Sequence, residues 1–467
     1  MKVEQIYTGC LAQGAYFIVS EGEAAVIDPL RECSPYLERA KKEKVSIKYI
    51  FETHFHADFV SGHVDLSEKT GAEIVFGPGA ETEFKCHVAK DGEEFHLGKI
   101  RIRALHTPGH TPESTTYLLI DEKGKEHCIF SGDTLFIGDV GRPDLAVKSD
   151  LTQEVLAGML YDSLRNKIMP LSDEVIVYPA HGAGSACGKN LSKETFDTLG
   201  NQKKKNYALQ NISKEDFVKE LTTGILPPPQ YFPKNALLNK KGYEPIDNVV
   251  LKGNKSLTAQ EFENIARETH ALILDVRKPI DFALAHLPNS IFIGLDGQFA
   301  PWVGALITDL HQPILLVTPE GREEETIMRL SRVGYDKTLG YLHGGIVAWT
   351  TSGRKTDQVK SITALEFEND FNTGKIEITD VRKPGEFNTQ HINGAQNKPL
   401  DFIHDWVGTV DQKELRYVHC AGGYRSMIAC SILKSRGIHQ VIDVQGGFSA
   451  IQKTNIPTTE STCSSAK

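Results

Sequence analysis

The stretch Thr53-His54-Phe55-His56-Ala57-Asp58 decides the fold of the first part of this chain. It ends an apolar run at residues 47–53, which predicts a buried strand that leads directly into the first histidine. Two imidazoles two residues apart on a tight turn, with a carboxylate two residues further on, can converge on one point. Histidine and aspartate are ligands of zinc and iron in proteins. The stretch therefore predicts a metal site at the end of a strand.

Three further short motifs have the same character. Each follows a predicted strand, at residues 100–105, 128–130 and 175–178. The motifs are TPGHT with His110, SGDT with Asp133 and PAHG with His181. Because loops at the carboxyl ends of strands gather at one edge of a sheet, we expect the four motifs to meet there.

In this order and spacing, the four motifs resemble the metallo-β-lactamase superfamily. The resemblance implies an α/β fold, an αββα sandwich, over residues 1–245. Dinuclear members such as glyoxalase II have a histidine directly after the aspartate of the first motif, and it helps to hold a second metal. Here that residue is Phe59, which favours a single metal.

Other stretches resemble the bacterial persulfide dioxygenases that are fused to two rhodanese units: GRPD at residues 141–144, LPPPQ at 226–230 and HGAGSACGK at 181–189. This resemblance implies one Fe(II) per chain, held by His54, His110 and Asp133, with positions left open for a persulfide and O₂. It implies oxidation of a glutathione, coenzyme A or bacillithiol persulfide to sulfite and the free thiol. Three more side chains would orient water and ligands around the ion: His56, Asp58 and His181.

Two residues near this expected site have two interpretations each. Cys187 lies in the glycine-rich loop after His181, either as a thiol that senses or relays persulfide sulfur or as a small buried loop residue. Arg142 could bind a substrate carboxylate or pair with Asp144, and we expect the pair. The basic run at residues 203–205 is expected to be a solvated helix face rather than a site for an anionic thiol carrier.

An internal repeat follows the first domain. DVRKP at residues 275–279 recurs at residues 380–384, an offset of 105, and Gly344-Gly345 recurs as Gly446-Gly447, an offset of 102. Each copy alternates predicted strands and helices, which indicates a small parallel α/β domain. We expect an extended proline-rich connector from residue 227 to 245, repeats at residues 246–357 and 358–458, and a disordered polar tail at 459–467.

The second copy carries CAGGYRS at residues 420–426, and with DVR, Glu386-Phe387 and HINGA at residues 391–395 it resembles a rhodanese domain. Its glycines allow several backbone N–H groups to point at the Cys420 sulfur, and a helix expected to begin near Ser426 adds positive potential. That environment favours a thiolate and then a persulfide. We expect Arg425 to bind the oxygens of sulfite or thiosulfate, and Asp380 and Arg382 to be structural.

The first copy has no cysteine between residues 252 and 353. Its corresponding strand, residues 314–317, runs into TPEGREEE, where we align Pro319 with the cysteine of the second copy. The three consecutive glutamates at residues 323–325 would repel a sulfur oxyanion. We therefore expect no sulfur transfer there, and a role in spacing or packing.

Bulk properties restrict the partners and the location. A net charge of −9 and a pI near 6.0 argue against a broad nucleic-acid surface, and no run of about 18 apolar residues predicts a membrane span. Residues 1–7 have no signal-peptide core, and the 8 cysteines include no CxxC pair, which indicates a reducing cytoplasm. By resemblance to the fusions, we expect a homodimer or homotetramer.

Three functions remain open from the sequence. The first is a persulfide dioxygenase coupled to sulfur transfer, with thiosulfate formed or used, which would remove sulfide-derived persulfides. The second is a zinc thioester hydrolase of the glyoxalase II kind, against which Phe59 and the expected lack of a helical C-terminal substrate domain argue. The third is a non-enzymatic binding module, against which the intact loop at Cys420 argues. Metal analysis would separate the two enzymes.

Overall fold

The computed structural model describes residues 1–147, 150–189, 191–374 and 376–460. The chain forms two compact units: Met1–Asn248 with Leu330–Gly334, and Val249–Arg329 with Tyr335–Lys467. No helix of the described residues has the length and the apolar character needed to cross a bilayer.

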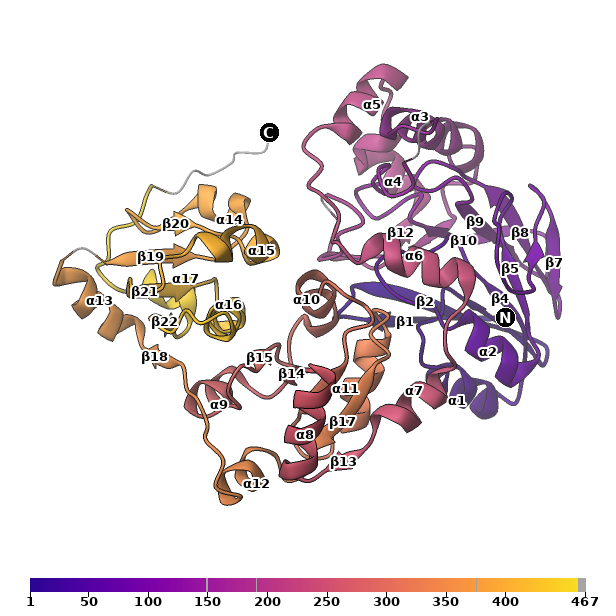
Figure 1. The fold of residues 1–467 in the computed structure, drawn as a ribbon. Coiled ribbons are helices and arrows are strands. Elements are labelled where there is room, and N and C mark those ends of the chain that lie inside the picture. Colours follow the sequence, from indigo (N-terminus) through magenta and orange to yellow (C-terminus); the bar gives the residue numbers. More distant parts are fainter. Residues whose placement is uncertain (148–149, 190, 375, 461–467) are drawn as a thin grey trace. The chain divides into compact units, whose positions relative to one another are not determined.

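The first unit is built on two six-stranded sheets (Figure 1). The first sheet has the order β1-β2-β3-β4-β5-β6, with strands β1 (Lys2–Thr8), β2 (Gln13–Ser20), β3 (Glu23–Ile27), β4 (Ser46–Phe51), β5 (Glu73–Phe76) and β6 (His87–Val88). The second has the order β12-β11-β10-β9-β8-β7, with strands β7 (Glu94–Leu97), β8 (Ile100–His106), β9 (Thr115–Ile120), β10 (Glu126–Gly132), β11 (Ile176–Pro179) and β12 (Asp197–Thr198).

Alternation along the strands places apolar side chains on both faces of each sheet. In β2, Tyr16 and Ile18 face the second sheet, where Phe130 joins their cluster, whereas Phe17 faces helices α1 (Ser34–Glu43) and α2 (His63–Thr70). The outer face of the second sheet packs against α3 (Gln153–Ser163) and α5 (Lys214–Thr222) through a cluster that includes Phe217. The predicted αββα sandwich is confirmed.

One helix, α6 (Phe232–Lys241), occupies the segment 227–245 that the sequence predicted to be an extended connector. Other helical segments lie before and after it: a π-helical turn, Leu164–Ile168, that extends α3, then α4 (Leu199–Lys205), a 3₁₀ turn at Tyr207–Leu209, and α7 (Ile246–Gly253). The prediction was wrong because it took prolines as helix breakers. Pro233 lies in the first turn of α6, where the missing N–H of proline has no intrahelical partner to lose. Pro35 likewise lies in the first turn of α1.

The second unit contains two five-stranded parallel sheets with the same topology, which confirms the internal repeat. The first repeat has the order β13-β17-β16-β14-β15, with β13 (Ser256–Leu257), β14 (Leu272–Asp275), β15 (Ile291–Phe292), β16 (Ile314–Val317), β17 (Thr338–Leu342) and helices α8 (Ala259–Thr269), α9 (Pro279–Leu284), α10 (Phe299–Leu306), α11 (Glu323–Ser331) and α12 (Gly345–Thr351).

The second repeat has the order β18-β22-β21-β19-β20, with β18 (Lys360–Ile362), β19 (Glu377–Asp380), β20 (Gln396–Asn397), β21 (Arg416–His419), β22 (Val441–Val444) and helices α13 (Ala364–Asn372), α14 (Pro384–Thr389), α15 (Ile403–Trp406), α16 (Tyr424–Ser435) and α17 (Gly447–Ile451); 3₁₀ turns lie at Leu400–Phe402 and Val407–Thr409. Thr459, which the sequence prediction placed in a disordered tail, is held in the fold, because its N–H donates to the His391 carbonyl at 2.8 Å. The rest of that prediction, residues 461–467, lies outside the described residues.

Candidate functional site

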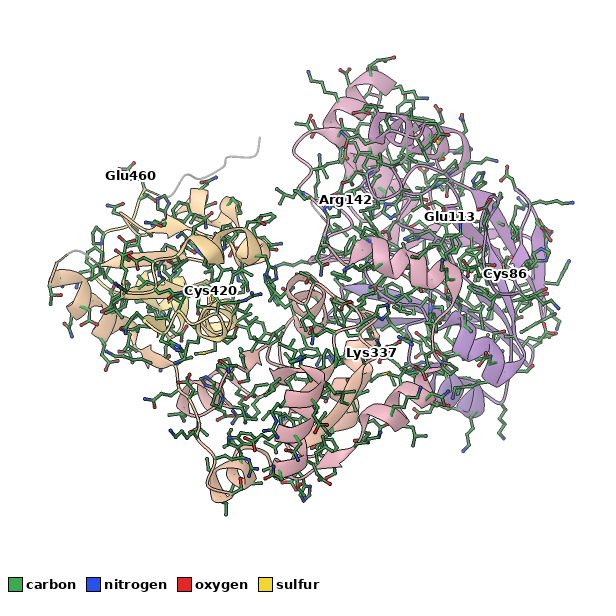
Figure 2. The ribbon with its side chains drawn as sticks, in the orientation of Figure 1. Cys86, Glu113, Arg142, Lys337, Cys420 and Glu460 are labelled. Carbon is green, nitrogen blue, oxygen red and sulfur yellow. The ribbon has the colours of Figure 1, made fainter. Side chains whose placement is uncertain are left out.

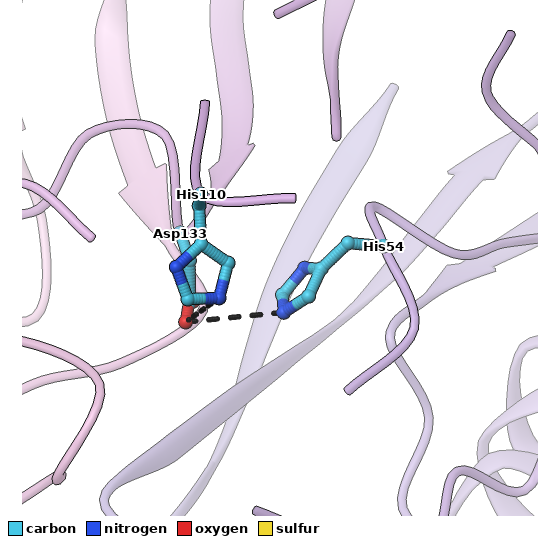
Figure 3. Close-up of side chains that lie close together, drawn as sticks. All are labelled: His54, His110 and Asp133. Carbon is cyan, nitrogen blue, oxygen red and sulfur yellow. Dashed lines mark ion pairs between the residues drawn. The ribbon is translucent and has the colours of Figure 1, made fainter. Parts of the chain in front are cut away.

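Two imidazoles and a carboxylate meet where three strands of the sandwich end (Figure 3). His54 follows β4, His110 follows β8 and Asp133 follows β10. The Asp133 Oδ2 lies 3.3 Å from His110 Nε2 and 3.8 Å from His54 Nε2. All three side chains are buried, and their ligand atoms lie within 4.8 Å of one another. The sequence motifs therefore do converge as predicted.

Hydrogen bonds on the far side of each ring fix its tautomer. The Thr53 hydroxyl donates to Asp28 Oδ2 at 2.8 Å and so accepts from His54 Nδ1 at 3.0 Å. His110 Nδ1 donates to the Arg142 carbonyl at 2.8 Å. Each ring thus directs an Nε2 lone pair at the site. Burial, and then three neighbouring imidazoles, lowers the pKa of His54 well below its usual range, which keeps the ring neutral.

The donor atoms fit a cation. Within the described parts of the chain, neither carboxylate oxygen of the buried Asp133 receives a hydrogen bond. A buried carboxylate without donors is unfavourable unless a positive charge compensates it. Two neutral imidazoles and one carboxylate on one side of a point suit a borderline metal such as zinc or iron. These three residues could therefore hold one metal ion.

His56 lies against a pair of carboxylates that the motifs did not predict. Its Nε2 is 3.1 Å from Asp28 Oδ1 and 3.3 Å from Glu52 Oε2, and its ring stacks on Phe59 with centroids 4.3 Å apart. Burial alone would lower the pKa of His56, but the carboxylates of Asp28 and Glu52 raise it well above its usual range. Asp28 and Glu52 each follow a buried strand, which is the signal in the sequence that could have found them.

Asn239 on α6 holds the backbone of the first motif. Its Nδ2 donates to the His56 carbonyl at 2.7 Å and to the Phe59 carbonyl at 2.8 Å, and its Oδ1 accepts from the Ser61 N–H at 2.8 Å. These bonds take up backbone groups that a helix would use, so α2 begins only at His63. Because residues 56 and 239 are distant in sequence, no local pattern indicated this role.

A second group of side chains lies near Oδ1 of Asp133. His181 Nε2 is 3.7 Å from Asp133 Oδ1 and 3.4 Å from Asp58 Oδ2. Cys187 is buried beside them, and the ligand atoms of Asp133, His181 and Cys187 lie within 4.8 Å of one another. Burial, reinforced by the carboxylates of Asp58 and Asp133, raises the pKa of Cys187 well above its usual range and favours the thiol.

Arg142 connects the metal-ligating groups to the glycine-rich loop (labelled in Figure 2). Its guanidinium donates two bonds to Asp144, at 2.6 and 2.7 Å, and one to the Ala186 carbonyl at 3.2 Å. The backbone N–H of Arg142 donates to the Cys187 carbonyl at 3.0 Å, and the backbone carbonyl of Arg142 accepts from His110 Nδ1. The expected pair with Asp144 is present, and the arginine ties His110 to the loop that carries Cys187.

Cys420 lies directly after β21 in the second repeat (labelled in Figure 2). The Gly423 N–H donates to the Cys420 sulfur at 3.1 Å, and the Ser426 hydroxyl lies 3.6 Å from that sulfur. Gly423 has φ +98°, a conformation that glycine adopts readily, and α16 begins at the next residue, two positions earlier than predicted. The loop thus directs one backbone donor of the described residues at a buried cysteine, where the sequence predicted several.

Two arginines near Cys420, Arg382 and Arg425, are already paired with carboxylates. Arg425 donates two bonds of 2.7 Å to the Glu386 carboxylate. Arg382 Nη2 donates to Asp380 at 2.6 Å, which is the structural pair that the sequence predicted. Glu386 therefore already balances the charge of Arg425 beside Cys420. An anion bound at Cys420 would be contacted more directly by the backbone N–H groups of the loop.

In the equivalent loop of the first repeat, a carboxylate of the loop itself accepts the hydrogen bonds. Parallel pairing aligns Asp275 with Val317 and Asp380 with His419, so Thr318, and not the predicted Pro319, corresponds to Cys420. Glu323 Oε1 accepts from the Gly321 N–H at 3.2 Å and from the Thr318 hydroxyl at 3.2 Å. In the first repeat a carboxylate thus accepts the hydrogen bond of the backbone N–H whose equivalent in the second repeat donates to the cysteine sulfur.

Comparison with known proteins supports the division into two chemistries. The chain matches the family model of the metallo-beta-lactamase superfamily over residues 8–181 and that of the rhodanese-like domain over residues 258–352 and 363–454. It is 31% identical over 210 residues to the human mitochondrial persulfide dioxygenase ETHE1, which covers 44% of this chain and 74% of that protein. It is 29% identical over 203 residues to a probable hydroxyacylglutathione hydrolase of Schizosaccharomyces pombe, which covers 42% of this chain and 75% of that protein. A solved metallo-beta-lactamase structure from Staphylococcus aureus is 30% identical, with a TM-score of 0.64, and covers 73% of this chain and 98% of that one.

Proposed function

The chain belongs to the metallo-β-lactamase superfamily and carries two rhodanese-like domains, and from this premise we propose that it is a persulfide dioxygenase fused to a sulfurtransferase. The supporting observation is that the buried side chains of His54, His110 and Asp133 converge on one point. The imidazole lone pairs are directed at this point, and the carboxylate receives no hydrogen bond from the described residues. Phe59 stands where a ligand of a second metal would be, which supports a single ion.

The reaction that we propose at this site is R–S–SH + O₂ + H₂O → R–SH + SO₃²⁻ + 2 H⁺. The outer sulfur of the persulfide is oxidised and dioxygen is reduced. One ferrous ion per chain, held by His54, His110 and Asp133, would supply the redox chemistry. The chain itself fixes the imidazole tautomers, excludes bulk water through burial, and brings Asp58, His181 and Cys187 close to Asp133, where they would contact a bound persulfide.

The second repeat would act on the products. Cys420 would take sulfane sulfur and exchange it with sulfite, with thiosulfate formed or used, and no such role falls to the first repeat. We assign residues 1–245 to the dioxygenase, 246–357 to the cysteine-free repeat and 358–458 to the sulfurtransferase. We also propose a homo-oligomer in the cytoplasm, with a glutathione, coenzyme A or bacillithiol persulfide as substrate.

Oxygen uptake tests the dioxygenase. Anaerobically purified protein should bind one iron per chain and consume oxygen with at least one persulfide of the panel. Asp133→Ala should abolish both, whereas Cys420→Ser should preserve the uptake and abolish thiosulfate formation. No oxygen consumption by the iron-loaded wild type with any persulfide would contradict the proposal.

A zinc thioester hydrolase is the second candidate. Hydroxyacylglutathione hydrolases are among the relatives, and α4, α5 and α6 follow the sandwich, although the sequence predicted no helical C-terminal substrate domain. The Asp58, His181 and Asp133 group would contribute to a second metal site in such an enzyme. Two bound zinc ions and thioester cleavage without oxygen uptake would favour this alternative.

A further inference from the structure

The helix that follows the sulfur loop contacts the cysteine-free repeat. Helix α16 begins at Tyr424, the residue after Gly423, whose N–H donates to the Cys420 sulfur at 3.1 Å. The Tyr424 hydroxyl donates to the Gly294 carbonyl of the first repeat at 2.6 Å, and its ring meets the edge of Phe292 with centroids 5.9 Å apart. The residue next to the sulfur-binding amide is thus held by the other repeat.

A second contact lies further along the same helix. The Phe292 N–H, at the end of β15, donates to the Ser431 hydroxyl at 2.9 Å. Ser431 lies seven residues after Tyr424, about two helical turns, so both side chains are on one face of α16. Figure 1 shows α16 beside β15. Two hydrogen bonds therefore fix the direction of α16 against the first repeat.

Glycines of the first repeat leave room for the tyrosine ring. A Cβ at Gly297 would lie 2.6 Å from Cζ, 2.7 Å from Cε2 and 2.9 Å from the hydroxyl oxygen of Tyr424. A Cβ at Gly294 would lie 3.1 Å from Cε2 of the same ring. Neither glycine has the left-handed backbone that would require glycine by itself. The close approach of Tyr424 therefore accounts for Gly297, whose three nearest neighbours all belong to that ring.

We propose that the cysteine-free repeat positions the sulfur-transfer loop, with Tyr424 as the positioning residue. The inference rests on the proposed sulfurtransferase function of Cys420. In that reaction the Cys420 thiolate attacks the outer sulfur of thiosulfate, the S–S bond breaks and sulfite leaves with the bonding electrons. A nucleophile such as cyanide then takes the outer sulfur from the Cys420 persulfide and restores the thiolate. Both anionic states need the Gly423 N–H to point at sulfur, and Tyr424 sets that direction.

The test uses the full chain, with thiosulfate and cyanide as substrates and iodoacetamide as a probe of Cys420. Gly297→Ala should displace the ring, lower kcat/KM about tenfold or more, and slow Cys420 alkylation at neutral pH, since misplacement of about 1 Å can cost up to a hundredfold. Tyr424→Phe, which keeps the ring and loses only the bond to Gly294, should show a smaller loss of about two- to fivefold. Mass spectrometry of the Cys420 peptide gives the alkylation rate separately from the other cysteines.

Gly408→Ala is the matched control, because a Cβ there has no neighbour within 4 Å, and it should leave both rates unchanged. A positioning role predicts slower alkylation even where the melting temperature is unchanged. Wild-type alkylation and turnover in both Gly297→Ala and Tyr424→Phe would overturn the inference, and the phenylalanine variant decides if the alanine variant does not fold. If the wild type itself does not turn over thiosulfate, the proposed function fails, but the alkylation rates still test the positioning.

Discussion

At the scale of single residues, the metal centre depends on side chains that touch its ligands. Thr53 donates its one hydroxyl proton to Asp28 and receives the Nδ1 proton of His54, so its position selects the His54 tautomer. Such outer partners contribute about 10- to 100-fold to metal affinity. The ligand motif alone therefore describes only part of the site.

Thr53→Val should weaken metal binding by about 10- to 100-fold, because it keeps the shape of the side chain and removes the acceptor of the His54 ring. Competition with a chelator for the metal measures this affinity. Thr326→Val, which removes an equally buried hydroxyl from the second unit, is the control and should bind metal like the wild type. Equal affinity of both variants would contradict the role of Thr53.

Asp443, a residue of β22, should make the stability of the second repeat depend on pH. Burial raises the pKa of Asp443 from 3.8 to about 6, and the hydroxyls of Ser426 and Ser361 offset only part of this rise. The folded-state pKa is above the unfolded value, so the stabilisation is complete below about pH 4 and is lost as the pH rises through about 6. The loss amounts to about 3 kcal/mol.

Asp443→Asn should therefore remove this loss and make the second repeat more stable than the wild type near neutral pH. Hydrogen exchange of the amides of β21 and β22 at about pH 4 and about pH 7 measures the two unfolding free energies. The wild type should lose up to about 3 kcal/mol more than the variant between these conditions. The same change in both proteins would show that Asp443 does not titrate in this range.

At the scale of elements, α6 supports the metal loop through one side chain. Asn239→Ala leaves two carbonyls and one N–H of the buried loop without their partner, so we expect a loss of about 2–4 kcal/mol in the unfolding free energy of the first unit. Metal affinity should fall as well, because His56 and Phe59 belong to that loop. Asn235→Ala on the same helix is the control. It removes a buried amide that makes no hydrogen bond with the described residues, and it should retain metal affinity.

The elements that the sequence predicted correctly are those with a local cause. Strand ends that carry His54, His110, Asp133 and Cys420 lie as predicted, because apolar runs fix the strands and the following polar residue marks the edge of the sheet. The existence of α6 was missed, and the hydrogen bonds that α6 makes join it to a segment that is distant in sequence. The same holds for the Glu386 partner of Arg425, which lies on α14.

At the scale of the whole molecule, the chain contains the same α/β repeat twice and uses it in two ways. The topology, the Asp–Arg pair and the glycine-rich strand ends are shared, as Asp275–Arg277 and Asp380–Arg382 illustrate. The loops after β16 and β21 differ in more than the missing thiol. In the first repeat Glu323 accepts the N–H of Gly321, whereas in the second repeat the equivalent N–H is directed at sulfur.

Restoring a thiol to the first repeat should therefore fail to restore sulfur transfer. In a Cys420→Ser background, Thr318→Cys should show less than about 1% of wild-type thiosulfate turnover. The Glu323 carboxylate competes for the Gly321 N–H, and it repels an anionic persulfide by about 3 kcal/mol or more. Adding Glu323→Ala frees the Gly321 N–H and should raise the alkylation rate of the introduced thiol severalfold. Turnover above about a tenth of the wild type with Thr318→Cys alone would contradict this prediction. It would mean that the missing thiol alone makes the first repeat inactive and that the Glu323 carboxylate does not contribute.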